Sequence, residues 1–179
     1  MFLIVSILYF QIPKNQKALE ECGPNLAWSF DSSTSNLLIS GSGEMNNFDY
    51  YKNKFTPWHS NSFKILSITI ENGVTSIGDF AFSYSTSLTT INIPGSVTSI
   101  GSLAFYQCSS LTTINIPDNV KYIGLYVFSY CTSLTHIRIG DILNTDSFSS
   151  LNIKLTITHV NISNKVTYIG KRAFYDYSK

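Results

Sequence analysis

The side chains best suited to chemistry in this sequence are two histidines and an arginine that follow one spacing. His136 and His159 lie 23 residues apart, and Arg138 and Asn161 have the same separation. A pair of imidazoles suggests a metal site, but protein zinc sites take three or four ligands and the sequence offers no third one. We therefore predict that the chain binds no metal ion and uses no cofactor.

Motifs for catalysis are missing from the sequence. It contains no G-x-S-x-G, no H-E-x-x-H, no phosphate-binding loop and no dinucleotide fingerprint. The run Ser40-Gly41-Ser42-Gly43 is followed by neither a lysine nor a helix start, so we interpret it as a turn. Asp49 and Asp79 have no evident carboxylate partner for acid–base chemistry. We predict that the protein is not an enzyme.

The composition excludes several partners. Of 179 residues, 44% are hydrophobic, which is enough for a core, but only 13% are charged, against roughly 25% in typical soluble domains. The chain instead holds 26 Ser, 16 Thr and 15 Asn. The formal net charge of +1 removes the attraction to phosphate on which nucleic-acid binding depends. The longest apolar run is too short for a membrane-spanning helix.

The first residues and the cysteines bear on location. Met1 to Phe10 reads MFLIVSILYF, the length of a signal-peptide core, so residues 1–18 are a candidate secretory signal. The positive residues that usually precede such a core are missing, and a first β-strand or an incorrectly assigned chain start are the alternatives. The three cysteines are too few for a disulfide framework and leave the compartment open.

A repeat of 23 residues organises the chain from residue 65 onward. The segments 88–110 and 111–133 superimpose without a gap, and 65–87 precedes them in the same register. The segment 134–156 keeps the length but loses most of the pattern, and 157–179 recovers it. These five units predict a solenoid, because a single unit cannot bury enough apolar surface to be stable alone.

Each unit begins with a pattern of alternating residues. Ile91-Asn92-Ile93 places two apolar side chains on one side of a short strand, and Pro94 ends that strand because proline cannot donate to a ladder. A second apolar pair follows, and after it comes a glycine, for which we expect a bend with positive φ. The unit then continues with an Ala-Phe pair, which predicts a short helical or irregular turn. The glycines of this column are Gly78, Gly101, Gly124 and Gly170.

This unit resembles a known family. The pattern L-x-x-I-x-I-P-x-x-V-x-x-I-G-x-x-A-F-x-x-C is similar to the BspA-like leucine-rich repeats of bacterial and protozoan surface antigens. In the third unit it is carried by Leu111, Ile114, Ile116, Pro117, Val120, Ile123, Gly124, Phe128 and Cys131. Cys22-Gly23, Trp28, Leu37–Met45 and Pro57-Trp58 resemble the entry segment of such proteins. The resemblance implies an extracellular surface for adhesion or host interaction, without catalysis.

The two ends of the array raise different questions. Residues 22–64 are rich in aromatic residues, which we predict to form an N-terminal β cap over the first coil; a carbohydrate-stacking site is the alternative. At Lys179 no polar capping unit follows. We expect either a longer array or end-to-end self-association with another chain. The predicted fold is therefore a leucine-rich-repeat solenoid with a parallel sheet on one face and turns on the other.

The exposed strand positions are the candidate binding residues. The third and fifth positions of each unit should point away from the core, onto the open face of the sheet. An ordinary solvated face is the alternative to a protein- or glycan-binding patch. The candidates are Thr90, Asn92, Thr113, Asn115, His136, Arg138, His159 and Asn161.

Two further features concern modification. Asn161-Ile162-Ser163 is an N-glycosylation sequon in this same face, so Asn161 is a possible glycosylation site. Cys108 and Cys131 occupy one column of adjacent coils, close enough for a disulfide, or else they are buried thiols.

The predicted function is a cell-surface or secreted, adhesin-like binding module. Its partner would be a host-cell or extracellular-matrix protein or glycan, not a nucleic acid. The alternative is a structural protein that assembles by stacking through its last repeat.

Overall fold

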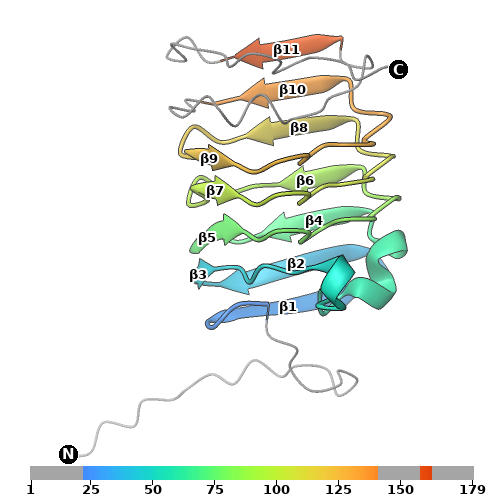
Figure 1. The fold of residues 1–179 in the computed structure, drawn as a ribbon, viewed down its shortest axis with the longest axis vertical. Coiled ribbons are helices and arrows are strands. Elements are labelled where there is room, and N and C mark those ends of the chain that lie inside the picture. Colours follow the sequence, from blue (N-terminus) through green and yellow to red (C-terminus); the bar gives the residue numbers. More distant parts are fainter. Residues whose placement is uncertain (1–21, 141–157, 163–179) are drawn as a thin grey trace, which may run out of the picture.

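The structure is a computed structural model that describes residues 22–140 and 158–162. Successive coils stack along one axis, from β1 (Leu26–Asp31) at one end to β11 (His159–Ile162) at the other (Figure 1). The candidate signal of residues 1–18, most of the unit 134–156 and most of the unit 157–179 lie outside the described residues. The predicted solenoid is confirmed.

One side of the stack is a row of strands that pair in parallel from β2 onward, while β1 is antiparallel to β2, and the strands of the repeats lie at the predicted positions. The register pairs residues exactly one repeat apart, such as Ser67 with Thr90 and His136 with Thr113. On this side the strands are hydrogen-bonded in the order β1-β2-β4-β6, and β8-β10-β11 follow further along the stack (Figure 1). The remaining strands of this side are β2 (Asn36–Gly41), β4 (Ser67–Ile70), β6 (Thr90–Asn92), β8 (Thr113–Ile116) and β10 (His136–Ile139).

A second parallel sheet covers an adjacent side of the coils that contain β2, β4, β6 and β8. Its strands are β3 (Gly43–Glu44), β5 (Val74–Ile77), β7 (Ser99–Ile100) and β9 (Tyr122–Ile123), in that order. The second apolar pair of the repeat supplies the buried residues here, for example Val74 and Ile77, which are 0% and 1% exposed. The sequence predicted one sheet, because β3, β7 and β9 have two residues each, too few for a period-2 pattern to show.

The third side consists of turns that also form a hydrogen-bonded ladder. The amide of Phe82 donates to the carbonyl of Ala104 at 2.8 Å, and the amide of Phe105 donates to that of Val127 at 3.0 Å. In both of these bonds the earlier coil donates to the later one. The predicted turns are irregular and not helical in the described coils.

These turns place large residues in the left-handed region of backbone conformation. In each of the coils 65–87, 88–110 and 111–133, two residues four positions apart have φ between 55° and 62°. Such values cost L-residues energy, which the ladder and the buried Ala-Phe pair must offset. The residues are Phe80, Tyr84, Leu103, Gln107, Tyr126 and Tyr130.

The expected positive φ is wrong for Gly78, Gly101 and Gly124, and Gly170 lies outside the described residues. Positive φ among the glycines is confined, within the described residues, to Gly41, Gly43 and Gly73. A Cβ at Gly101 would instead collide with the backbone of Asp79, and one at Gly124 with that of Ser102. The glycine column is therefore required because backbones of consecutive coils approach each other closely there.

The core is a set of columns that run along the stack. The rings of Trp58, Phe82, Phe105 and Phe128 are stacked, with successive centroids 5.8, 5.6 and 5.6 Å apart. Trp58 belongs to the cap, and its indole N–H donates to the carbonyl of Ala81 at 2.9 Å. The cap thus continues the aromatic column of the repeats and closes their first coil.

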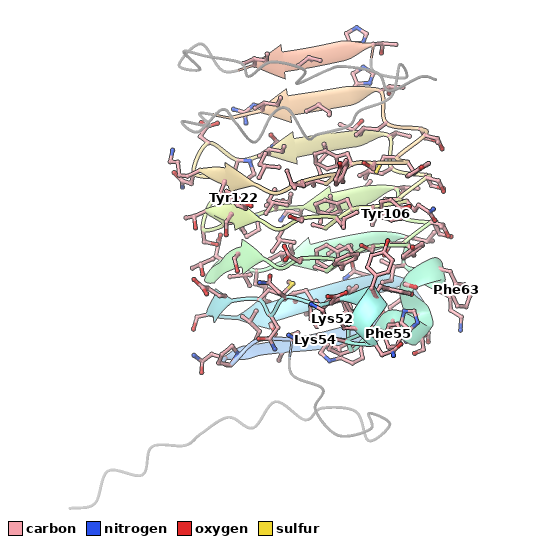
Figure 2. The ribbon with its side chains drawn as sticks, in the orientation of Figure 1. Lys52, Lys54, Phe55, Phe63, Tyr106 and Tyr122 are labelled. Carbon is pink, nitrogen blue, oxygen red and sulfur yellow. The ribbon has the colours of Figure 1, made fainter. Side chains whose placement is uncertain are left out.

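The cap also holds two short 3-10 helices, η1 (Tyr50–Lys52) and η2 (His59–Lys64). Not all of its aromatic residues are buried in the core: Tyr51, Phe55 and Phe63 are exposed, and Phe63 is part of η2 (Figure 2). The cysteines are free and buried, which favours buried thiols over a disulfide between Cys108 and Cys131.

Candidate binding surface on the strands

The outward side of β4, β6, β8, β10 and β11, which we call the strand face, carries all eight candidate residues. Each of them is exposed, whereas the alternating apolar residues Ile114, Ile116, Ile137 and Ile139 are at most 1% exposed. The pleat of a strand requires this alternation, because successive side chains point to opposite sides. The repeat brings the eight side chains into two rows along the stack.

Many hydroxyl groups beside these rows are used to hold the coils together. The Oγ1 of Thr89 donates to the carbonyl of Leu66 at 3.0 Å, and that of Thr135 donates to the carbonyl of Thr112 at 3.3 Å. On the second sheet Thr98 bonds in the same way to Thr75 at 3.1 Å. The many Ser and Thr residues are thus in part a structural device, since each such bond joins adjacent coils.

The candidate rows differ from this pattern. Among the described residues, the side chains of Thr90, Asn92 and Thr113 have no hydrogen-bond partner within the protein. In the first coil, by contrast, Asn36 accepts from both Ser67 at 2.8 Å and Thr69 at 3.3 Å. The hydrogen-bonding groups that remain open to another molecule therefore begin at β6.

Arg138 is held in place across one coil. Its Nη1 donates to the Oδ1 of Asn115 at 3.0 Å, and its Nη2 lies 3.2 Å from the Oδ1 of Asp118. The side chains of Arg138 and Asp118 are 47% and 51% exposed, so this ion pair adds little to stability. Together with the bond to Asn115 it orients the guanidinium toward the preceding coil.

The two histidines are brought together by the register of β10 and β11. His136 and His159 are Cα partners, and their rings are parallel within 4° with centroids 4.5 Å apart. The described residues contain no group of three or more metal-ligating side chains. Asn161 is the register partner of Arg138, so the glycosylation sequon lies beside the arginine.

A row of tyrosines on the turn side was not predicted from the sequence. Tyr84 and Tyr106 are 5.4 Å apart, and Tyr106 and Tyr130 are 5.3 Å apart, in each case edge to face. Tyr106 is seen beside the turns in Figure 2. The available signal was Phe-Ser-Tyr at 82–84 and 128–130, but Tyr106 stands one position earlier in its unit, which hid the column.

The fold and its polar face define a class of protein: a solenoid of leucine-rich repeats. A family model described as the BspA type leucine-rich repeat region (6 copies) matches residues 57–179, more than half of the chain. The chain belongs to this family. No curated protein sequence matches it. Among the described residues no helix is long and apolar enough to cross a membrane.

Solved structures resemble the chain at low sequence identity. A leucine-rich repeat protein from Eubacterium ventriosum is 20% identical with a TM-score of 0.53, and the match covers 80% of this chain and 43% of that one. The T. pallidum leucine-rich repeat protein is 16% identical (TM-score 0.44; 76% and 78% covered). A leucine-rich cell surface protein from Faecalibacterium prausnitzii is 19% identical (TM-score 0.41; 72% and 56% covered). The chain spans less than half of the Eubacterium protein, and that likeness supports the fold alone.

Proposed function

We propose that the chain is a non-catalytic binding module, presented at a cell surface or secreted, whose strand face binds a host-cell or matrix protein or glycan. The observation that carries this proposal is the contrast between two sets of polar side chains. The hydroxyls of Thr89 and Thr135 donate to carbonyls of the neighbouring coil. The side chains of Thr90, Asn92 and Thr113, by contrast, have no hydrogen-bond partner among the described residues.

Recognition on this face depends on hydrogen bonds more than on charge. Arg138 is the only charged residue among the eight candidates, and Asp118 neutralises it. Rigid parallel strands about 4.8 Å apart present donors and acceptors at a fixed repeat. Binding a partner that matches this repeat costs little conformational entropy of the protein, because the strand face is already ordered.

Arg138 is the anchor of the proposed surface. It is held in its orientation by Asn115 and Asp118, and Arg is enriched among residues that dominate binding energy. Reversing its charge removes its N–H donors and places a carboxylate near Asp118, so the variant loses attraction and gains repulsion.

The test compares two charge reversals in a binding assay on host cells or matrix. Arg138→Glu lies on the strand face, and Lys54→Glu lies in the cap, where Lys54 is also exposed. We expect Arg138→Glu to lower binding at least about tenfold, the loss of one charged hydrogen bond, and Lys54→Glu to leave it within about twofold. Equal effects of the two variants would contradict the assignment.

Asn161 enters this proposal as a possible modification. It is exposed in β11 beside Arg138, and a glycan there would cover part of the face. Mass spectrometry of material secreted by a glycosylating host decides the point: an unmodified Asn161 ends the proposal of glycosylation and leaves the strand face open.

The alternative, assembly by stacking through the last repeat, rests on the sequence alone. Light scattering distinguishes it from the binding module. A chain that stays monomeric at high concentration contradicts assembly, and growth of the mass with concentration supports it.

A further inference from the structure

The turn between β4 and β5 carries the one Asn-Gly pair of the sequence, Asn72-Gly73 (Figure 1). Asn72 is exposed, and its side chain has no hydrogen-bond partner among the described residues. Glycine has no Cβ that would keep its backbone nitrogen away from the side-chain carbonyl carbon of the preceding asparagine. The pair is therefore a candidate for covalent self-modification, in which the only reagents are the chain and water.

The reaction has two steps and needs neither an oxidant nor a cofactor. In the first, the backbone nitrogen of Gly73 loses its proton and attacks Cγ of Asn72. The new N–Cγ bond closes a five-membered succinimide ring, and the side-chain nitrogen takes up the proton and leaves as ammonia. In the second, water adds to one of the two ring carbonyls. Cleavage of the N–Cγ bond then gives aspartate, and cleavage at the backbone carbonyl gives isoaspartate, whose main chain runs through Cγ.

The fold requires the glycine of this pair. Gly73 has a φ of 109°, and a Cβ at this position would lie 2.6 Å from the carbonyl oxygen of Gly41 in β2. The equivalent positions of the next two coils hold Gly95-Ser96 and Asp118-Asn119. The reactive pair is thus confined to the coil 65–87, where the turn passes close to the cap.

The amide groups of this turn are held by both neighbouring layers of the stack. The carbonyl of Gly73 accepts from the amide of Gly43 at 2.9 Å, and its N–H donates to the Oγ of Ser96 at 3.2 Å. The hydroxyl of Ser96 donates in turn to the carbonyl of Val74 at 2.8 Å. The two bonds of Ser96 are compatible, because a hydroxyl accepts through its lone pairs and donates its one proton. The next coil therefore binds the N–H group that the reaction has to deprotonate.

We propose that Asn72-Gly73 converts to aspartate and isoaspartate in the folded protein, and that the hydrogen bond from Gly73 to Ser96 sets the rate. Ring closure removes the proton of the Gly73 nitrogen and turns this amide toward Asn72, so the bond to Ser96 has to break first. The reaction then proceeds from the small fraction of molecules in which the two coils have separated locally at this turn. Because ammonia is lost, the product is a permanent record of that separation.

The modification changes the edge between the strand face and the second sheet. Either product places a new carboxylate beside Glu71, which is exposed. Isoaspartate also adds one methylene group to the main chain just before Val74, the first residue of β5. This proposal concerns the chain itself and does not depend on the proposed function of the strand face.

The same column of the next coil supplies a matched control. Asn119 stands one repeat after Ser96, and its Nδ2 donates to the carbonyl of Gly95 at 2.6 Å. It holds the turn of the second coil as Ser96 holds that of the first, but no hydrogen bond joins it to Gly73. Loss of either side chain removes a contact between adjacent coils, and only loss of Ser96 releases the nitrogen that attacks Asn72.

The test follows residue 72 by peptide mass spectrometry while the full chain is kept in mildly alkaline buffer. The same chain in urea gives the rate without the fold, which should be the faster one. We expect Ser96→Ala to convert about fivefold faster than the unchanged chain, the loss of one neutral hydrogen bond, and Asn119→Ala to stay within about twofold of it. An Asn72 that stays intact in the folded chain, an unchanged rate in Ser96→Ala, or equal acceleration by Asn119→Ala would overturn the proposal.

Hydrogen exchange of the Gly73 amide gives a readout that needs no chemical conversion. In the unchanged chain this amide should be protected, and its exchange should be faster in Ser96→Ala but not in Asn119→Ala. Exchange in the unchanged folded chain as fast as in urea would show that Ser96 does not hold the nitrogen, and it would contradict the proposal without recourse to any variant.

Discussion

The thiol of Cys108 donates a hydrogen bond to the carbonyl oxygen of Phe82, with Sγ 3.2 Å from O. One coil later Cys131 does the same with Phe105 at 3.1 Å. In the first coil this column holds Ser85, and the layer before it is the cap, where Trp58 stacks on Phe82. The Ser85 hydroxyl is buried without a partner.

Replacement of Ser85 should therefore stabilise the protein. Ser85→Ala removes a buried hydroxyl that has no hydrogen bond, and we expect the free energy of unfolding to rise by about 1 kcal/mol. Chemical denaturation measures this. Ser83→Ala is the matched control, because the Ser83 hydroxyl donates to the carbonyl of Leu103 at 2.6 Å, and it should be destabilising by about 1 kcal/mol. A loss of stability in Ser85→Ala would show that its hydroxyl has a partner.

The glycine column predicts a position-dependent cost. Gly101→Ala places a Cβ against the backbone of Asp79, which cannot move without separating two coils, and we expect a loss of at least about 2 kcal/mol. Gly95→Ala meets only the side-chain nitrogen of Asn119, 3.8 Å away, and should change stability by less than about 0.5 kcal/mol. Similar thermal stabilities of the two variants would mean that close coil-to-coil approach is not the reason for the glycine.

A sequence repeat indicates which residues lie in register on successive coils, but not which contacts form between two coils. The period and the apolar columns predicted the strands around Ile91, Ile114 and Ile137, because a solenoid repeats its contacts at the same spacing. The reason for the glycine was missed, since contact between Gly101 and Asp79 is a property of two coils and not of one unit.

The candidate site was predictable to a similar degree. Alternation alone indicated that Thr113 and Arg138 would be exposed. The ion pair with Asp118 could not be read from it, because Asp118 lies beyond the strand and the direction of a long side chain depends on its rotamer. The stacking of His136 on His159 likewise depends on ring orientation, and each Nδ1 atom lies 2.9 Å from the Oγ1 of the preceding threonine.

Burial of Cys22 predicts a loss of stability in alkaline solution. Desolvation raises the pKa of its thiol from 9.0 to about 11. Between these values the unfolded chain releases a proton that the folded chain keeps, so the contribution is complete below pH 9 and decreases as the pH rises to 11. The expected decrease is about 2 to 3 kcal/mol.

A variant isolates this thiol from the other groups that titrate at alkaline pH. In Cys22→Ala the free energy of unfolding should fall less between pH 8 and pH 11 than in the unchanged chain, by about 2 kcal/mol. Denaturation curves at several pH values give both slopes. Equal slopes would show that Cys22 is ionised as easily in the folded chain as in the unfolded one.

The most direct test of the central claim blocks one side of the solenoid at a time. Thr113→Cys on the strand face and Thr98→Cys on the second sheet are exposed threonines that each become a labelling site, while the native cysteines are buried. After coupling to a bulky maleimide polymer, binding to host cells or matrix should be lost for Thr113→Cys and retained for Thr98→Cys. Retained binding with the polymer at position 113 would contradict the proposal that the strand face is the binding surface.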